Sequence, residues 1–154
     1  MKKIILSIIT LIVFSISGNA QVEPHAIGIR LGGGNFGNGA ELNYLHGLGD
    51  ANRLEVGLGL NSLNSSSYMN LVSVYQWVFS LEEGFSWYVG PGAQLLLVKD
   101  ASAILVGGEI GVEYNFNTNL ETPLQIGLDT RPMFNLGDGD GFGWGVALSI
   151  RYTF

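Results

Sequence analysis

The chain has 154 residues, with 7 basic and 13 acidic side chains, a formal net charge of −6 and no cysteine. The acidic excess disfavours nucleic-acid binding, which needs Lys and Arg to displace counterions from phosphates. The lack of cysteine excludes disulfides and thiolate metal sites. We therefore expect no nucleic-acid partner and no cofactor.

The first 20 residues have the three parts of a secretory signal peptide. Two lysines follow Met1, an apolar or small run extends from Ile4 to Ile16, and Ala20 ends a small-residue cleavage site. The apolar run is shorter than the roughly 20 residues that a membrane helix needs. We expect cleavage after Ala20, export, and one mature domain over residues 21–154.

The rest of the chain contains eight segments in which large apolar residues alternate with small or polar ones. Such alternation places the two sets on opposite faces of a β-strand. Clusters of Gly, Asn, Asp and Ser separate the segments. In chain order we expect strands at about His25–Gly33, Gly39–His46, Arg53–Asn61, Tyr68–Phe79, Phe85–Leu97, Ala103–Phe116, Pro123–Met133 and Gly143–Phe154.

The last of these segments indicates a lipid-facing surface. Its large residues form one face, with aromatics at both ends and aliphatics between them: Trp144, Val146, Leu148, Ile150, Tyr152 and Phe154. That order is typical of a strand whose middle meets lipid tails and whose ends meet headgroups. An ambiguous segment is then assigned by the same logic: in Tyr68–Phe79 two sets compete, and we place Met69, Leu71, Tyr75, Trp77 and Phe79 outside rather than Val72, Val74 and Val78, because Asn70 and Gln76 then avoid the bilayer.

The apolar pattern that ends in Ile150, Tyr152 and Phe154 resembles the closing strand of Gram-negative outer-membrane β-barrels. In that family it is similar to the signal read by the barrel-assembly machinery. The whole mature chain resembles the small eight-stranded barrels of the OmpA and OmpX kind. The resemblance implies an all-β, antiparallel up-and-down transmembrane β-barrel in the cell outer membrane. We expect a monomer whose partners are outer-membrane lipids and the assembly machinery.

An even strand count sorts the connections between the two sides of the membrane. Four would face outward, at Gly33–Asn38, Ser62–Ser67, Val98–Ser102 and Phe134–Phe142, and three would face the periplasm, at Gly47–Asn52, Ser80–Gly84 and Asn117–Thr122. We expect an irregularity at Pro91, which cannot donate to a strand ladder. No second domain, linker or internal helix is indicated.

Charged residues of the predicted strands fall on the face opposite the lipid: Arg30, Glu41, Glu55, Glu109, Glu113, Asp129, Arg131 and Arg151. Counting from the turns places Glu109 opposite Arg131, and Arg30 near Glu41 or Asn43. We predict ion pairs that cross the lumen, with inward glycines making room for the long side chains. The interior of an eight-stranded barrel is just wide enough for side chains to fill it, so a structural plug is favoured over a selective ion path.

We therefore expect a non-enzymatic structural protein of the outer membrane with a closed lumen. A first alternative is a narrow pore for small ions or solutes, which single-channel recording would detect. A second is a soluble periplasmic barrel that binds an apolar ligand, which requires the apolar faces to point inward.

Three motifs that carry chemistry elsewhere are interpreted here as structural. Glycines at 32–37 match the spacing of a dinucleotide loop but precede a strand rather than a helix, and Asp138–Gly141 lacks the later ligands of a calcium loop. Lipid-A-modifying barrels need a histidine beside a serine and a carboxylate. His25 and His46 fall near the periplasmic rim, a hydrocarbon thickness of about 30 Å from the serines at 62 and 65–67.

Overall fold

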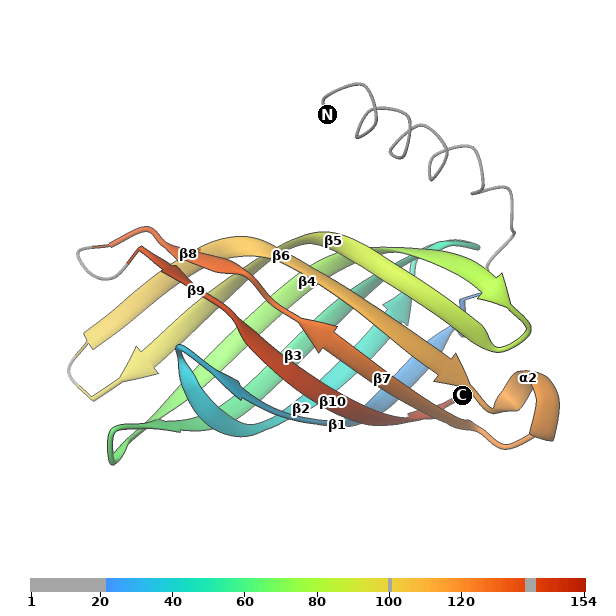
Figure 1. The fold of residues 1–154 in the computed structure, drawn as a ribbon, viewed down its shortest axis with the longest axis horizontal. Coiled ribbons are helices and arrows are strands. Elements are labelled where there is room, and N and C mark those ends of the chain that lie inside the picture. The colour runs from blue at the N-terminus through green and yellow to red at the C-terminus, as the bar shows by residue number, and fades with distance from the viewer. Residues whose placement is uncertain (1–21, 100, 138–140) are drawn as a thin grey trace, which may run out of the picture.

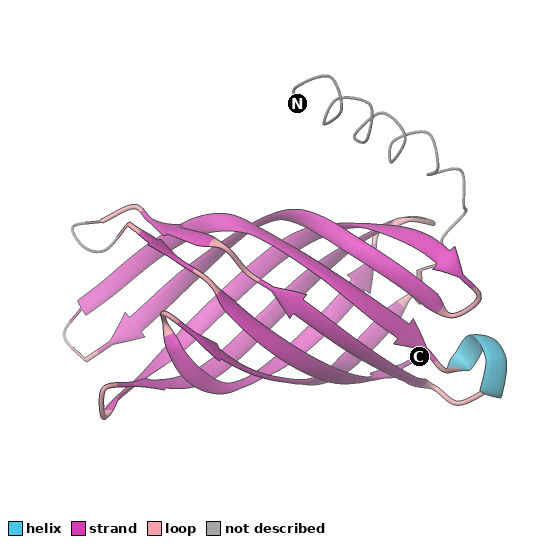
Figure 2. Ribbon diagram, in the orientation of Figure 1, coloured by secondary structure: helices cyan, strands magenta, loops and turns pink. Residues whose placement is uncertain are grey.

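A computed structural model describes residues 22–99, 101–137 and 141–154. They form an antiparallel sheet with one short helix (Figures 1 and 2). The predicted signal peptide and the 138–141 turn lie wholly or largely outside the described residues. The elements are β1 (His25–Gly34), β2 (Gly37–Gly47), β3 (Asn52–Leu63), β4 (Ser66–Glu82), β5 (Phe85–Val98), β6 (Ala101–Asn115), α2 (Asn117–Leu120), β7 (Leu124–Thr130), β8 (Met133–Asn135), β9 (Phe142–Gly143) and β10 (Gly145–Thr153).

The sheet closes on itself as an eight-stranded barrel, as predicted. Each strand from β1 to β6 pairs with the next, β5 pairs with β6, and β1 pairs with β10. β7 and β8 are successive parts of the seventh strand, because both pair with β6. β9 and β10 are likewise parts of the eighth. Closure leaves no open edge, so backbone polar groups can pair between strands, as hydrocarbon requires.

The seventh and eighth strands are interrupted, where the sequence predicted continuous strands. The break in the seventh lies at Arg131 and Pro132, and Pro132 has no N–H for the ladder. The break in the eighth lies at Trp144, whose backbone carbonyl accepts from Asn35 N at 3.0 Å. The two breaks lie beside each other, because Arg131 N donates to Gly145 O at 3.2 Å. Pro91 lies within β5 without a change of register to β6. On its other side the β4–β5 ladder skips Pro91 and Gly90, so the predicted irregularity is present toward β4.

Several connections are shorter than the sequence predicted. The β3–β4 hairpin turns at Asn64 and Ser65, which have φ of 48° and 68°, and Gly37 follows the β1–β2 turn with φ of 93°. Such left-handed residues suit two-residue hairpin turns. Some polar and glycine residues that were predicted as outer loops therefore belong to the strands. The strands continue along the chain past the last residues of their apolar alternation.

One connection that was predicted to face the periplasm contains a helix, which the sequence did not indicate. Residues Asn117–Leu120 form one turn of helix, α2, which ends at Glu121 with φ of 50°. It lies at the end of the barrel that carries the C-terminus (Figure 1). In the part of the chain that the structure describes, no helix is both long and apolar enough to span a bilayer.

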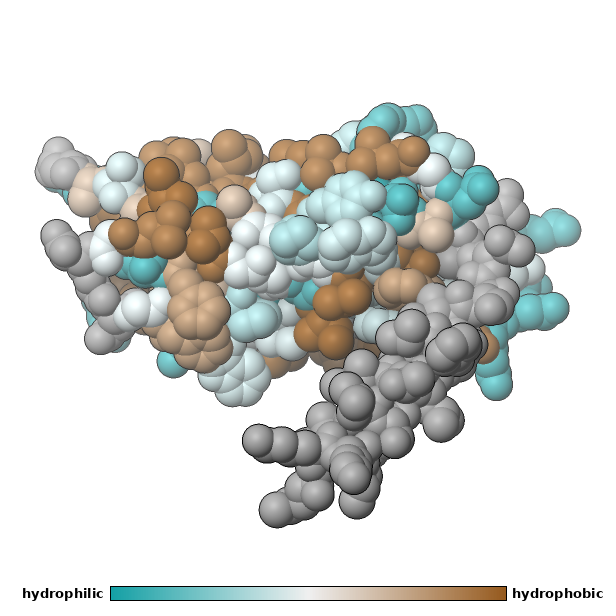
Figure 3. Space-filling model, turned by 90° about the horizontal axis from the view of Figure 1, so that it is seen from above, coloured by the Kyte–Doolittle hydropathy of each residue, from teal (hydrophilic) through white to brown (hydrophobic). Residues whose placement is uncertain are grey.

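The two faces of the barrel differ as the alternation predicted. Large apolar side chains are exposed on the outer wall of every strand, among them Ile29, Leu58 and Ile150. Figure 3 shows them over much of the side wall, with hydrophilic residues gathered at the end that carries α2. In β4, Met69, Leu71 and Trp77 are exposed and Tyr75 and Phe79 are half-buried, whereas the competing valines and both Asn70 and Gln76 are buried, so the assigned phase is confirmed. The alternative of a barrel with an apolar, ligand-binding interior is wrong, because charged side chains fill the lumen.

Candidate functional site

The candidate site is the lumen itself. All four arginines of the chain point into it. Seven of the eight residues predicted for the lumen are at most 6% exposed, and the side chain of the eighth, Arg30, is 12% exposed. Five carboxylates join the arginines: Glu41, Glu55, Glu109, Glu113 and Asp129. The interior therefore holds nearly balanced charge removed from solvent.

Arg131 is the centre of this cluster. It follows the end of β7, and its guanidinium contacts three carboxylates. Nη1 donates to both oxygens of Glu41 at 2.9 and 3.0 Å, Nη2 contacts Glu55, and Nε contacts Glu109. The planar fork of an arginine suits such multiple recognition, since its donors point in fixed directions. One cation thus links strands β2, β3 and β6 across the lumen.

The predicted pairing of Arg30 needs a correction. Arg30 does lie opposite Glu41 in the β1–β2 register, as predicted. Its ion pair, however, is with Asp129 of β7, where Nη2 lies 2.5 Å and Nε 3.0 Å from Oδ1. Glu41 turns instead to Arg131. The inward residues of β10, which lies between β1 and β7, are the small Ala147 and Ser149. Arg30 therefore reaches past β10 to Asp129 instead of pairing with Glu41 on the adjacent strand β2.

Arg53 is a lumen residue that the sequence analysis missed. It is 2% exposed, and its two Nη atoms donate to the two oxygens of Glu113 at 2.8 and 2.7 Å. Its guanidinium also lies 4.8 Å from the centre of the Tyr88 ring. The signal was present: Arg53 and Glu55 are two apart on one strand and so share a face.

Gln76 joins the two halves of the network. Its carbonyl oxygen accepts from Arg53 Nε at 2.5 Å, and its amide nitrogen donates to Glu55 at 2.8 Å and to Glu109 at 2.7 Å. Arg151 adds a weaker link, 3.5 Å from Glu55 and 3.9 Å from Glu113. The charges from Glu41 to Glu113 therefore form one continuous polar network along the barrel axis.

Inward glycines make room for these side chains. A Cβ built on Gly57 would lie 2.4 Å from Glu41 Oε1, and one on Gly111 would lie 2.5 Å from the Tyr88 hydroxyl. A larger residue at either position would displace the network or the tyrosine. The glycine content of the strands thus has a steric reason.

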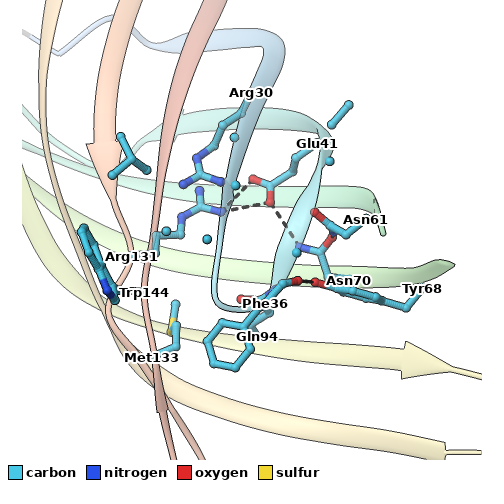
Figure 4. Close-up of a pocket in the computed structure, with 18 residues that line it drawn as sticks. Arg30, Phe36, Glu41, Asn61, Tyr68, Asn70, Gln94, Arg131, Met133 and Trp144 are labelled. Carbon is cyan, nitrogen blue, oxygen red and sulfur yellow. Dashed lines mark hydrogen bonds and ion pairs between the residues drawn. The ribbon is translucent and has the colours of Figure 1, made fainter. Parts of the chain in front are cut away.

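A cavity lies at the end of the network that is nearest to the β1–β2 turn. Figure 4 shows Arg30, Glu41 and Arg131 converging beneath it, with Asn61, Asn70 and Tyr68 along one side. Asn70 donates to Glu41 at 3.2 Å, and the Tyr68 hydroxyl donates to the backbone carbonyl of Phe36 in the β1–β2 turn. The turn is thereby fastened over the opening.

A second cavity lies at the barrel end that carries α2 and is lined by Arg53 and Glu113. The segment Val22–Pro24 crosses this end. Val22 N donates to Asp50 O at 3.0 Å, Pro24 O accepts from Gly47 N at 2.8 Å, and Glu23 accepts from the Asn115 side chain at 3.0 Å. These contacts anchor the segment on both sides of the opening.

Two of the three motifs interpreted as structural fall within the described residues. His25 and His46 lie at one end of β1 and β2, whereas Ser62 and Ser66 flank the β3–β4 turn at the other end. Of the 32–37 glycines, Gly32, Gly33 and Gly34 end β1, and Gly37 begins β2. Among the described residues, no group of three or more His, Cys, Asp or Glu side chains could hold a metal ion.

The residues of the predicted assembly signal lie on the outer wall. Ile150, Tyr152 and Phe154 are 51%, 54% and 57% exposed. Tyr152 and Phe154 stack with ring centres 6.1 Å apart, and Phe154 N donates to His25 O at 2.9 Å. They therefore face outward along the seam where the first and last strands meet.

Comparison with known proteins identifies the fold. No model of a known protein family matches the chain, and no curated protein matches it. Neisserial surface protein A, at 10% identity, matches with a TM-score of 0.64 over 84% of this chain and 96% of its own. The N-terminal β-barrel domain of Pseudomonas aeruginosa OprF, at 16% identity, matches with a TM-score of 0.54 over 84% of this chain and 97% of its own.

A designed transmembrane β-barrel, at 17% identity, matches with a TM-score of 0.57 over 88% of this chain and 99% of its own. These matches cover most of this chain and nearly the whole of each matched chain, so the likeness is one of the complete fold. The closed topology, the apolar outer wall and these matches agree: the chain folds as a small eight-stranded β-barrel of the outer-membrane type.

Proposed function

We propose that the protein is a structural component of the outer membrane whose lumen is closed by its ion network. The observation that carries the proposal is Arg131, which contacts Glu41, Glu55 and Glu109 at once. Opening a path through the lumen would separate these groups while they remain shielded from water. Breaking a buried ion pair in this way costs about 3–5 kcal/mol.

The two barrel ends support the same proposal. The β1–β2 turn is fastened over the outer cavity through Tyr68, and the segment Val22–Pro24 lies across the periplasmic cavity. The lumen is thus blocked at three levels, by the ion network in its middle and by a segment at each end. A conducting channel would need a continuous aqueous path.

Single-channel recording in planar bilayers tests this function. We expect the folded protein to insert without producing discrete conductance steps. Swelling of proteoliposomes in small sugars provides a second measurement, and we expect none above protein-free vesicles. Reproducible steps or swelling would overturn the closed-lumen proposal.

One observation favours the alternative of a narrow pore. Cavities lie at both ends of the lumen, and the ion network alone separates the one lined by Arg131 from the one lined by Arg53. Small ions could pass if the central side chains moved apart. Conductance that rises when Gln76→Ala is introduced, from a measurable wild-type level, would support the pore.

We further propose that the protein has no catalytic activity and acts as a monomer. The separation of both histidines from the serines at the opposite barrel end supports the first point. Incubation with lipid A followed by mass spectrometry tests it, and a change in acyl-chain mass would contradict it. Sedimentation in detergent tests the second point.

Assembly is proposed to depend on Ile150, Tyr152 and Phe154. Their outward orientation on the closing strand leaves them available to another protein before the barrel closes. We expect Phe154→Ala to lower the amount of folded barrel in the outer membrane, while Phe134→Ala, an exposed aromatic of β8, leaves it unchanged. Equal amounts of folded barrel for the two variants would contradict the proposed assembly signal.

A further inference from the structure

The only two histidines of the chain lie side by side on the outer wall, at the periplasmic end. His25 opens β1 and is paired in register with His46 of β2. Their neighbours Ala26 and Leu45 point into the barrel, so both imidazoles point outward. The rigid sheet therefore holds the two rings next to each other, at a level that periplasmic water reaches.

The imidazoles face each other through their Nδ1 atoms. These atoms are 3.3 Å apart, whereas the ring centres are 5.1 Å apart and the ring planes differ by 28°. Because the nitrogens are closer than the centres, the nitrogen-bearing edges point toward each other. Two nitrogens bound to one tetrahedral metal ion at 2.0–2.1 Å would be about 3.3 Å apart.

Tyr44 brings a third possible ligand atom to the same place. It lies two residues before His46 on the same face of β2, and its hydroxyl is 2.7 Å from His25 Nδ1. The planes of the Tyr44 and His25 rings are nearly parallel, at 13° to each other. A phenol can donate to Nδ1 only when that nitrogen carries its lone pair, and this tautomer is the one that binds a metal through Nδ1.

We propose that His25 Nδ1, His46 Nδ1 and the Tyr44 hydroxyl oxygen form a binding site for one Zn²⁺ or Cu²⁺ ion. Imidazole nitrogen suits these metals, whereas Mg²⁺ and Ca²⁺ prefer sets of oxygen ligands. Water completes the coordination. On binding, the His46 proton moves from Nδ1 to Nε2 through solvent, and the phenol proton is released.

The site also connects to the closing seam of the barrel. Phe154 of the last strand packs on His25, with ring centres 5.5 Å apart, and its N–H donates to the His25 carbonyl. A metal that fixes His25 would hold the ends of β10, β1 and β2 together. Because the unfolded chain does not hold the two imidazoles in place, metal binding should raise the temperature of unfolding.

Titration of the folded protein in detergent with Cu²⁺, followed by electron paramagnetic resonance, tests the proposal. We expect one equivalent bound with hyperfine coupling to two nitrogens, and we expect Cu²⁺ to displace Zn²⁺ bound beforehand, because such sites bind Cu²⁺ more tightly. His25→Phe and His46→Phe retain an aromatic ring for packing, and each should weaken binding by about tenfold or more, the cost of losing even an outer contact of a metal site. Tyr44→Phe should retain two-nitrogen coupling but lose the phenolate-to-copper absorption band.

Tyr114→Phe is the matched control, because its phenol lies at the same barrel end beside Asn119 and away from both histidines. It should bind copper as the wild type does. Circular dichroism establishes that each variant is folded, and His→Gln replaces any His→Phe variant that is not. Unchanged copper affinity in either folded histidine variant would overturn the site.

Discussion

The inner and outer walls of this barrel follow different rules, although the same strands build both. On β3, Glu55 is fully buried and meets Arg131 and Arg151, whereas Leu58 is 49% exposed on the outer wall. The inner residue depends on particular partners at hydrogen-bond distance. The outer residue depends only on being apolar, because lipid has no fixed shape to match. The side chains that must meet particular partners therefore lie on the inner wall.

The largest expected effect comes from removing the centre of the inner network. Arg131→Ala leaves Glu41, Glu55 and Glu109 buried without their shared cation. We expect the free energy of unfolding to fall by about 3–5 kcal/mol. Urea unfolding in lipid vesicles measures it, with Arg131→Lys as the charge-retaining control and a smaller loss. A fall of less than about 1 kcal/mol, the value of an exposed pair, would show that the two walls follow similar rules.

Placing a charge on the outer wall should cost somewhat less. Leu58 lies in the middle of β3, and Leu58→Arg should destabilise the barrel by about 2–4 kcal/mol in vesicles, since the guanidinium meets hydrocarbon. Leu63→Arg, at the end of the same strand, should cost about 0–1 kcal/mol. Equal effects at the two positions in the same unfolding measurement would contradict the placement of β3 across the bilayer.

An added methyl group tests how closely the inner wall is packed. Gly111→Ala would bring its Cβ to 2.5 Å from the Tyr88 ring, and overpacking of this kind costs about 1–3 kcal/mol. Tyr88→Leu in the same chain should recover part of that loss. A double-mutant cycle of unfolding free energies measures the coupling, and strictly additive effects would show that the tyrosine does not occupy the space beside Gly111.

The smallest effect is expected from a change of shape on the outer wall. Leu128→Ile on β7 keeps the side chain apolar and alters only its branching. We expect a change in unfolding free energy within about 0.5 kcal/mol. A larger loss would indicate that lipid-facing residues are also fitted to particular neighbours.

The sequence predicted whether a side chain lies on the inner or the outer wall better than it predicted which residue that side chain contacts. The period-two alternation placed Glu41, Glu55 and Glu109 inside, because a strand permits only two directions. The same rule, applied from Glu55 back to Arg53, would have found the missed arginine. It says nothing about which carboxylate an inward arginine meets, so Arg30 was assigned to the adjacent strand and instead reaches Asp129.

The residues at which the strands end also could not be predicted from the sequence pattern. Asn38, Ser62 and Gly34 have little strand propensity, yet they pair because their neighbours on the next strand continue the ladder. Conversely, the break at Arg131 and Pro132 was hidden, because residues on both sides of it keep the same inward and outward phase.

By itself, the sequence determined that apolar and polar residues alternate, that eight such segments follow one another, and that charged and apolar side chains lie on opposite faces. These features depend only on residue spacing along a strand. The tertiary structure alone decided that Arg131 is shared by three carboxylates, that the segment Val22–Pro24 crosses one mouth, and that His25 meets His46 and Tyr44. Those contacts depend on the tilt and register of a closed sheet, which bring together side chains far apart in the chain and set the distances between them.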